Sequence, residues 1–277
     1  MTSFLATGPS LGGSRVGAWL AGLSLRSRIL LISAEVVVML ALWQLVVGVF
    51  RWINPVFVPA PLSIFSGLGD ILSSGAVAAN APASLQAWVV GFGLALVIAI
   101  PLGLLLGVSL PVDRIVGPIA WAIYATPSVA YQPLAKAWFG FGIGPVVFLV
   151  LVSAVFPIMF NLAAGIRTTN TSIISAAKVY GASKFRLYPA IYLPSTVPFL
   201  FAGLRQGVVL ATIGMMVAEL SGAAVGMGAL IIRSTNTYQV GQAFAAIMLV
   251  VIFTISMVQV TTLVERWVAP WTRGAGK

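Results

Sequence analysis

Long apolar runs recur along this chain, and they constrain its fold more than any other feature. Each run is about 20 residues long, enough to cross a hydrocarbon layer of roughly 30 Å as an α-helix. The runs are continuous rather than alternating, which favours helices over a β-barrel. Only 7% of the 277 residues are charged, against roughly 25% in soluble domains. The sequence therefore predicts an all-α polytopic membrane protein.

We place six transmembrane helices in the sequence. They lie near residues 29–50, 84–108, 116–136, 144–166, 196–219 and 241–264, within a transmembrane domain of residues 29–265 that is flanked by tails of residues 1–28 and 266–277. With the N-terminus inside, the loops on the outer side keep only Arg51, Lys136 and Arg233, while the other basic residues between spans lie inside. This asymmetry follows the positive-inside rule and predicts a multi-pass protein of the inner or plasma membrane with both tails cytoplasmic.

Helix-breaking residues mark the segments between the predicted spans and interrupt some of the spans themselves. Residues 51–83 are rich in Pro, Ser and Gly and predict an outer loop with one short helix near residues 63–72. Residues 221–228 are too rich in glycine for a stable helix, and we expect a short helix after them. Pro101, Pro127, Pro133 and Pro157 fall within spans, where they predict kinks.

Composition excludes several functions. The formal net charge is +10, but the basic residues are scattered singly, so nucleic acid is not an expected partner. The chain has no Cys and no His, which removes disulfides, thiolate chemistry and the commonest metal ligands. We predict neither a catalytic residue nor a metal site. No Gly-x-x-x-x-Gly-Lys-[Ser/Thr] phosphate loop is present either, so ATP-driven work would need a partner that hydrolyses ATP.

One polar stretch, from Ser175 to Pro194, interrupts the apolar chain within the inner loop of residues 167–195. Its first part has the spacing of a short helix with one apolar face. Gly181 is placed to end or bend that helix as a C-cap glycine. The small residues around this bend would let a partner surface approach closely.

The pattern of this stretch is specific. Ala176-Ala177, then Gly181, then Ile191-x-Leu193-Pro194 resembles the coupling loop of ABC importer permeases, although Ser175 stands where that pattern often has Glu. Over about residues 58–265 the chain is similar to permeases of the nitrate, sulfonate and taurine importer type. The supporting motifs are Pro101–Gly107, Trp138–Gly144, Phe156-Pro157 with Asn161, Gly203–Arg205 and Ala218-Glu219.

The resemblance implies a type I importer permease fold with cytoplasmic coupling helices. It implies that two permease copies or homologues pair in the lipid membrane, that two ATPase subunits bind ATP and Mg²⁺ and dock on the inner loops, and that a binding protein delivers solute from outside. The chain itself would carry no cofactor. The segment implied to contact the ATPase comprises Ile174, Ser175, Ala176, Ala177, Lys178, Tyr180, Gly181, Ala182, Ser183, Lys184 and Phe185.

Polar residues within spans are candidates for the solute pathway. Three ionisable groups lie within the spans. Glu35 is expected to pair with Arg28 or a neighbour, and Arg205 to extend to the inner interface or bind loop carbonyls. Glu219 closes the fifth span and is expected to have a hydrogen-bonded or ionic partner. Lys136 either attracts an anion such as a sulfonate, nitrate or carboxylate, or extends to the outer interface. The predicted pathway or gate residues are Thr126, Ser128, Tyr131, Gln132, Lys136, Gln206, Thr212, Met215, Met216 and Glu219.

Two other functions are alternatives to an importer permease. A self-sufficient secondary transporter or channel would show inverted repeats and coupling acids near the midplane, and the sequence shows no convincing repeat. Gly67-Leu-Gly-Asp70 matches the Gly-x-Gly-Asp of intramembrane aspartyl proteases, but Asp70 lies in a predicted loop, and such a protease needs two acids that share one proton. The nearest second acid, Asp113, falls on the opposite membrane face.

Overall fold

The computed structural model describes residues 25–169, 172, 175, 177, 179–181 and 193–271. The regular elements within this part of the chain are all helices, as the sequence predicts. By its internal contacts the chain divides into two units, Met1–Ser63 and Ile64–Lys277.

The first unit contains one long helix, α2 (Leu25–Trp43), which continues as the π-helical turn η1 (Gln44–Val49). Gln44 Oε1 accepts the amide of Leu62 at 3.1 Å, at the start of α3 (Pro61–Ser73). This bond satisfies one amide that the first turn of a helix leaves free. Glu35 is exposed on α2, whereas the side chain of Arg28, its expected partner, lies outside the described residues.

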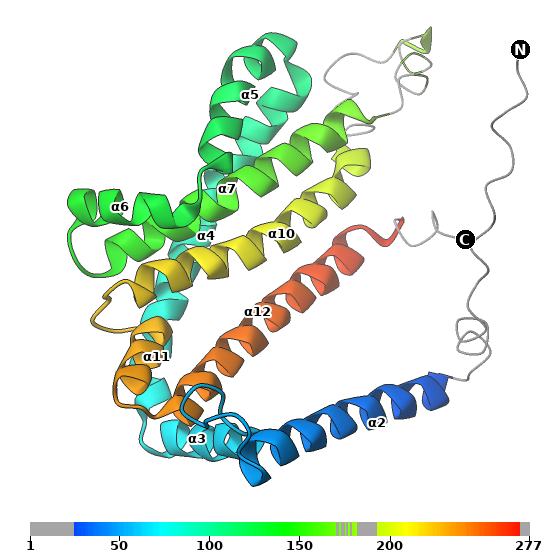
Figure 1. Cartoon of the computed structure of the whole chain (residues 1–277). Helices are drawn as coiled ribbons and strands as arrows, with labels where there is room; N and C mark the ends of the chain where they lie inside the picture. Colours follow the sequence, from blue (N-terminus) through cyan, green and yellow to red (C-terminus); the bar gives the residue numbers. More distant parts are fainter. Residues whose placement is uncertain are drawn as a thin grey trace, which may run out of the picture. The chain divides into compact units, whose positions relative to one another are not determined.

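The second unit is organised around α7 (Ile143–Arg167). Figure 1 shows α7 running beside α4 (Ala76–Val108) and α10 (Leu193–Leu220), and α7 packs along both. The side chains at the centre of this packing are small or medium-sized and fully buried; they include Ala95, Ala99, Leu149, Ala154, Ile158 and Ala211. Small residues let helix backbones approach closely, which is how helices associate in lipid.

Glycines set the distance between α4 and α7. A Cβ built on Gly103 would lie 2.8 Å from the Met159 carbonyl and 3.1 Å from the Leu162 Cβ, and one on Gly107 would meet Ile166 at 2.6 Å. Two small residues one helical turn apart favour close helix packing, and the neighbour here is α7.

Gly103→Leu should therefore destabilise the protein. The added side chain has to push α7 away from α4, which should cost about 1–3 kcal/mol and lower the Tm of the detergent-purified chain. Gly93→Leu on the same helix is the matched control, since a Cβ there meets nothing within 4 Å. Equal Tm values for the two variants would contradict this account of the packing.

The third predicted span, 116–136, is not one continuous helix. The chain forms α5 (Leu110–Ala125), the 3₁₀ turn η2 (Ser128–Tyr131) and α6 (Gln132–Phe139). Pro127 has no amide hydrogen and disfavours helical backbone at Thr126, which is extended with ψ of 125°. With 16 residues, α5 rises about 24 Å, short of a hydrocarbon core.

Five helices of the described chain are long and apolar enough to cross a membrane. They are Leu30–Val49, Ala76–Val108, Ile143–Arg167, Pro194–Leu220 and Val240–Val268. These correspond to five of the six predicted spans, and α4 begins earlier than expected. The short helices predicted in the connecting segments correspond to α3 and to α11 (Met227–Asn236).

Two ion pairs between described residues join helices of the second unit. Arg205 on α10 pairs with Glu265 on α12 (Val240–Val268), whereas the sequence predicted that it extends to the inner interface or binds loop carbonyls. Arg167 at the end of α7 pairs with Asp113 on α5 at 2.5 Å and also donates to the Leu106 carbonyl at 2.7 Å. Asp113 is thus engaged by a cation, which removes the second acid that an aspartyl protease would need.

Candidate solute pathway and coupling segment

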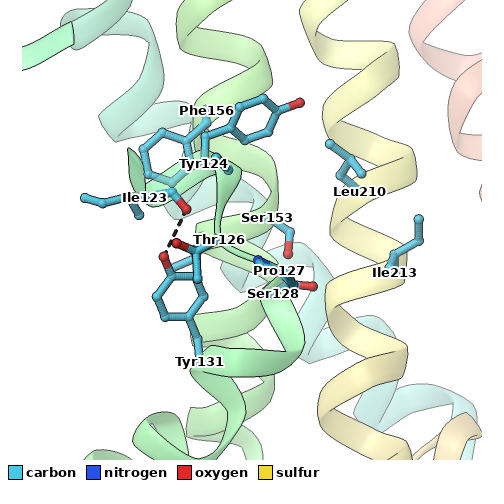
Figure 2. A pocket seen from close by; sticks show the side chains of 12 residues that line it. Ile123, Tyr124, Thr126, Pro127, Ser128, Tyr131, Ser153, Phe156, Leu210 and Ile213 are labelled. Carbon is cyan, nitrogen blue, oxygen red and sulfur yellow. Dashed lines mark hydrogen bonds between the residues drawn. The ribbon is translucent and has the colours of Figure 1, made fainter. Parts of the chain in front are cut away.

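The break after α5 opens a cavity of about 150 Å³ between η2, α7 and α10. Three predicted pathway residues, Thr126, Ser128 and Tyr131, line it. Figure 2 shows the α5 break on one side, Ser153 and Phe156 reaching in from α7, and Leu210 and Ile213 closing the side of α10. The proline that interrupts the predicted span thereby creates the cavity.

Hydroxyl groups of the lining hold the broken backbone together. Tyr131 OH donates to the Ile123 carbonyl at 2.9 Å, and Thr126 Oγ1 donates to the Ala122 carbonyl at 3.0 Å. These carbonyls belong to the last turn of α5, where a helix leaves its acceptors without intrahelical partners. The two side chains fix the shape of the cavity wall.

Tyr124, Ser153 and Phe156 also line this site, and sequence reasoning did not find them, because an aromatic or serine inside an apolar run gives no signal of its own. The only available signal was the Phe156-Pro157 motif. Gln206, a predicted pathway residue, lies beside the cavity, where its Nε2 donates to Tyr124 OH at 3.4 Å. Asn161 Nδ2 donates to Gln206 Oε1 at 3.2 Å.

The structure does not bring the other predicted pathway residues to this cavity. Thr212 is buried against α4, where it accepts a hydrogen bond from Trp88 Nε1 at 3.2 Å. Met215 is also buried and lines a second, apolar cavity of about 400 Å³ between α4, α10, α11 and α12. Met216 is partly buried against the core, and Gln132 begins α6.

Glu219 occupies a buried polar cluster at the end of α10. Its Oε1 accepts from Ser84 Oγ at 2.6 Å and its Oε2 accepts from the Gly228 amide at 2.8 Å. Ser84 Oγ accepts the Met227 amide at 2.8 Å, so the two side chains satisfy successive amides at the start of α11. The helix dipole of α10 disfavours an anion at this end, but the N-terminus of α11 favours it.

Asn80 completes this cluster from α4. Its Oδ1 accepts the Gly226 amide at 3.1 Å and Nη2 of Arg233 at 2.6 Å. A Cβ on Gly226 would lie 2.6 Å from the Glu219 carboxyl carbon, which explains the glycines of this segment. Side chains of α4 and α10 thus hold α11 by its first turn.

Lys136 is engaged rather than free. Its Nζ donates to the Ser221 carbonyl beyond the end of α10, and it lies 5.8 Å from the ring centroid of Phe141. Among the described residues, those that line the 150 Å³ cavity do not include Lys136. The sequence left two alternatives open for Lys136, attraction of an anion and extension to the outer interface. The structure adds a contact that joins α6 to the loop after α10.

The predicted coupling segment is described in part. Ser175, Ala177 and Val179 are helical, and Gly181 has φ of 82°, the left-handed conformation that a C-cap glycine adopts. Val179 and Tyr180 are 85% and 91% exposed. The predicted contact residues Ile174, Ala176, Lys178, Ala182, Ser183, Lys184 and Phe185 lie outside the described residues.

Similarity to known proteins shows the family to which this chain belongs. Residues 99–274, more than half of the chain, match the family described as binding-protein-dependent transport system inner membrane component. The chain belongs to this family. It is an ABC transporter permease and a multi-pass inner membrane protein.

Individual relatives agree with this assignment. The chain is 26% identical to the taurine transport system permease protein TauC of Escherichia coli strain K12, over 84% of this chain and 86% of TauC. It is 31% identical to the riboflavin transport system permease protein RibX of Chloroflexus aurantiacus, over 84% of this chain and 87% of RibX. The predicted resemblance to permeases of the taurine type is thereby confirmed.

A solved structure supports the fold. An inward facing structure of the MetNI methionine ABC transporter superposes on 68% of this permease and 94% of the matched chain with a TM-score of 0.57, at 20% sequence identity. At that identity the likeness concerns the fold alone.

Proposed function

We propose that this permease forms the translocation pathway of an ATP-driven importer for a small solute. Two copies, or this chain and a homologue, would pair in the membrane, and a binding protein would deliver the solute from outside. Both tails and the loop of residues 167–195 would lie in the cytoplasm. ATP and Mg²⁺ would be bound by two partner ATPase subunits, since this chain has no phosphate loop.

The exposed turn at Tyr180 and Gly181 carries the proposal. A valine and a tyrosine that are almost fully exposed on a short helix, next to a glycine with positive φ, form a protruding apolar contact. A Cβ on Gly181 would meet none of the described residues within 4 Å, so they leave room there for a partner. In a family defined by binding-protein-dependent transport, that partner is the ATPase.

The cargo is a small solute, and the structure gives no reason to require a negative charge. The expectation of an anion drew on Lys136, whose Nζ donates to the Ser221 carbonyl, and on the resemblance to permeases of the nitrate, sulfonate and taurine type. The names of the relatives cover taurine and riboflavin, which differ greatly in size. Such variety supports an importer permease without fixing its cargo.

Co-purification with the ATPase encoded beside this chain tests the proposal. Tagged wild-type permease should retain the ATPase in detergent, and Tyr180→Ala should retain at least several-fold less, because a central aromatic anchor contributes about 2 kcal/mol or more. Tyr238→Ala is the control, as Tyr238 is 77% exposed at the far turn between α11 and α12. Equal retention by the two variants, or none by the wild type, would count against the proposal.

A further inference from the structure

We propose that Arg167 and Asp113 are positioning residues for transport. Their ion pair ties the start of α5 to the end of α7, so that α5 and the cavity wall that it carries move with the coupling segment. This inference rests on the proposed function, because it concerns how the same permease passes a movement of the ATPase to its pathway. Three features carry it: the junction at Arg167, the few attachments of α5, and the place of Arg167 at the base of the coupling loop.

Arg167 joins the ends of three helices. Its Nη2 lies 2.5 Å from Oδ1 of Asp113 in the first turn of α5, and it donates to the Leu106 carbonyl in the last turn of α4 at 2.7 Å. An acid suits the start of a helix, and the last carbonyls of a helix have no intrahelical partners. Gly117 leaves room for the acid, since a Cβ there would lie 3.1 Å from Oδ1 of Asp113. One guanidinium group therefore fixes α7 to both sides of the turn between α4 and α5.

The packing of α5 against the rest of the described chain is sparse. Gly117 and Ala120 are the residues of this helix that the described chain buries, while Ile119 is 60% exposed. Near the far end of α5, Trp121 stacks on Phe160 of α7 with ring centroids 4.2 Å apart. A helix with so little packing takes its position from the contacts at its ends. Beyond the turn from α4, both of these end contacts are made with α7.

The far end of α5 forms a wall of the 150 Å³ cavity. Ile123 and Tyr124 in its last turn and Thr126 just after it line this cavity. The Tyr124 ring lies 5.9 Å from the ring of Phe156 on α7, between centroids. A helix of 16 residues is a rigid element about 24 Å long. A shift at Asp113 is therefore carried along α5 to the cavity wall.

The end of α7 is also the start of the coupling loop. Arg167 is the last residue of α7, and the loop of residues 167–195 contains the predicted coupling segment. Thr169 Oγ1 is hydrogen-bonded to the Gly165 carbonyl at 3.3 Å and to Ser195 Oγ, at the other end of the loop, at 3.0 Å. These bonds hold the base of the loop against α7. A push on the coupling segment would reach Arg167 through this base, and α5 through Asp113.

The ion pair should matter more for coupling than for stability. The side chains of Arg167 and Asp113 are 42% and 29% exposed, and ion pairs that water reaches add little to stability. Without the pair, the permease should still fold and bind the ATPase, but the start of α5 would no longer follow α7. Each movement of the ATPase would then be passed to the cavity wall incompletely. The number of solute molecules imported per ATP hydrolysed, the coupling ratio, should therefore fall while the Tm changes little.

Coupling ratios test the inference in proteoliposomes that hold the permease, the ATPase and the binding protein. Asp113→Arg places two cations at the junction and should lower the ratio at least about threefold. The double variant with Asp113→Arg and Arg167→Asp restores opposite charges and should return the ratio to within about twofold of wild type, as expected for two residues that act as a pair. General damage to the fold would not be repaired by a second substitution.

Arg114→Asp is the matched control. Arg114 is exposed at the next position of α5, and adjacent positions on a helix do not face each other. This variant changes one charge by the same amount as Asp113→Arg, but it leaves the pair with Arg167 in place. Its coupling ratio should equal that of wild type.

The outcomes separate this inference from the proposed function. An unchanged ratio in Asp113→Arg, an equal fall in Arg114→Asp, or a double variant no better than Asp113→Arg would overturn the inference. ATP-driven uptake by the wild type would still support the proposed function in each of these cases. Absence of that uptake would overturn the proposed function and this inference with it.

Discussion

Replacing Gly181 with valine is expected to abolish ATP-driven uptake while leaving the permease folded in the membrane. Gly181 has φ of 82°, which a β-branched residue adopts only with strain. The turn would shift to a conformation that valine tolerates, and the exposed Tyr180 would move with it. Uptake into proteoliposomes that also hold the ATPase and the binding protein should fall by at least about tenfold.

Gly75→Val is the matched control for this result. Gly75 has φ of 72°, and a Cβ there also meets nothing within 4 Å, but it precedes α4 far along the chain from the coupling segment. Both variants should lose about 1–2 kcal/mol of stability from the strained backbone. Only Gly181→Val should lose uptake. If both variants transport equally well or equally poorly, the role assigned to the turn at Gly181 is wrong.

The largest loss of stability is expected from Glu219→Ala. Glu219 is 2% exposed, and its removal leaves the Gly228 amide without its acceptor and Ser84 Oγ without its own. A buried donor left unpaired costs about 1–3 kcal/mol, so the total should reach about 2–4 kcal/mol. The Tm of the purified permease should fall accordingly.

Glu219→Gln separates hydrogen bonding from space filling in this cluster. The amide oxygen of Gln can still accept from Gly228, but its NH₂ group faces Ser84, which must turn its hydroxyl. The loss should be about half that of Glu219→Ala. Hydrogen exchange should show the amides of Met227 and Gly228 exposed in the alanine variant only. A Tm for Glu219→Ala within error of wild type would contradict the capping role.

The helix class and most spans follow from the sequence because membrane insertion leaves few choices. A continuous apolar run must become a helix to satisfy its backbone in lipid, whatever its neighbours do. The left-handed backbone at Gly181 was likewise predictable, since few other residues end a helix in that conformation. These features depend on local chemistry alone.

Features that depend on neighbours could not be predicted in the same way. The segment 116–136 is apolar enough to span, and only the geometry at Thr126 and Pro127 shows that it breaks. The partners of Arg205 and Glu219 come from residues far away in sequence, Glu265 and Ser84. Hydropathy places residues at a depth, but it does not say which helix stands beside them.

The same limitation applies to the side chains of α10. Gln206, Leu210 and Ile213 lie on the face of α10 toward the break, whereas Thr212 and Met215 lie on the face toward α4. Their positions within the span are nearly equal, so depth alone could not separate them. The rotation of α10 is set by close contacts with α7, such as Gly214 against the Leu149 carbonyl, where a Cβ would lie 2.6 Å away.

Reconstituted uptake tests the central claim most directly. Proteoliposomes should be prepared with this permease alone, with the ATPase added, and with the ATPase, the binding protein and ATP together, using the solute that the binding protein carries. Uptake should occur only in the complete mixture and stop when ATP is withheld. Uptake by the permease alone, driven by a solute or ion gradient without ATP, would contradict the claim and indicate a self-sufficient transporter.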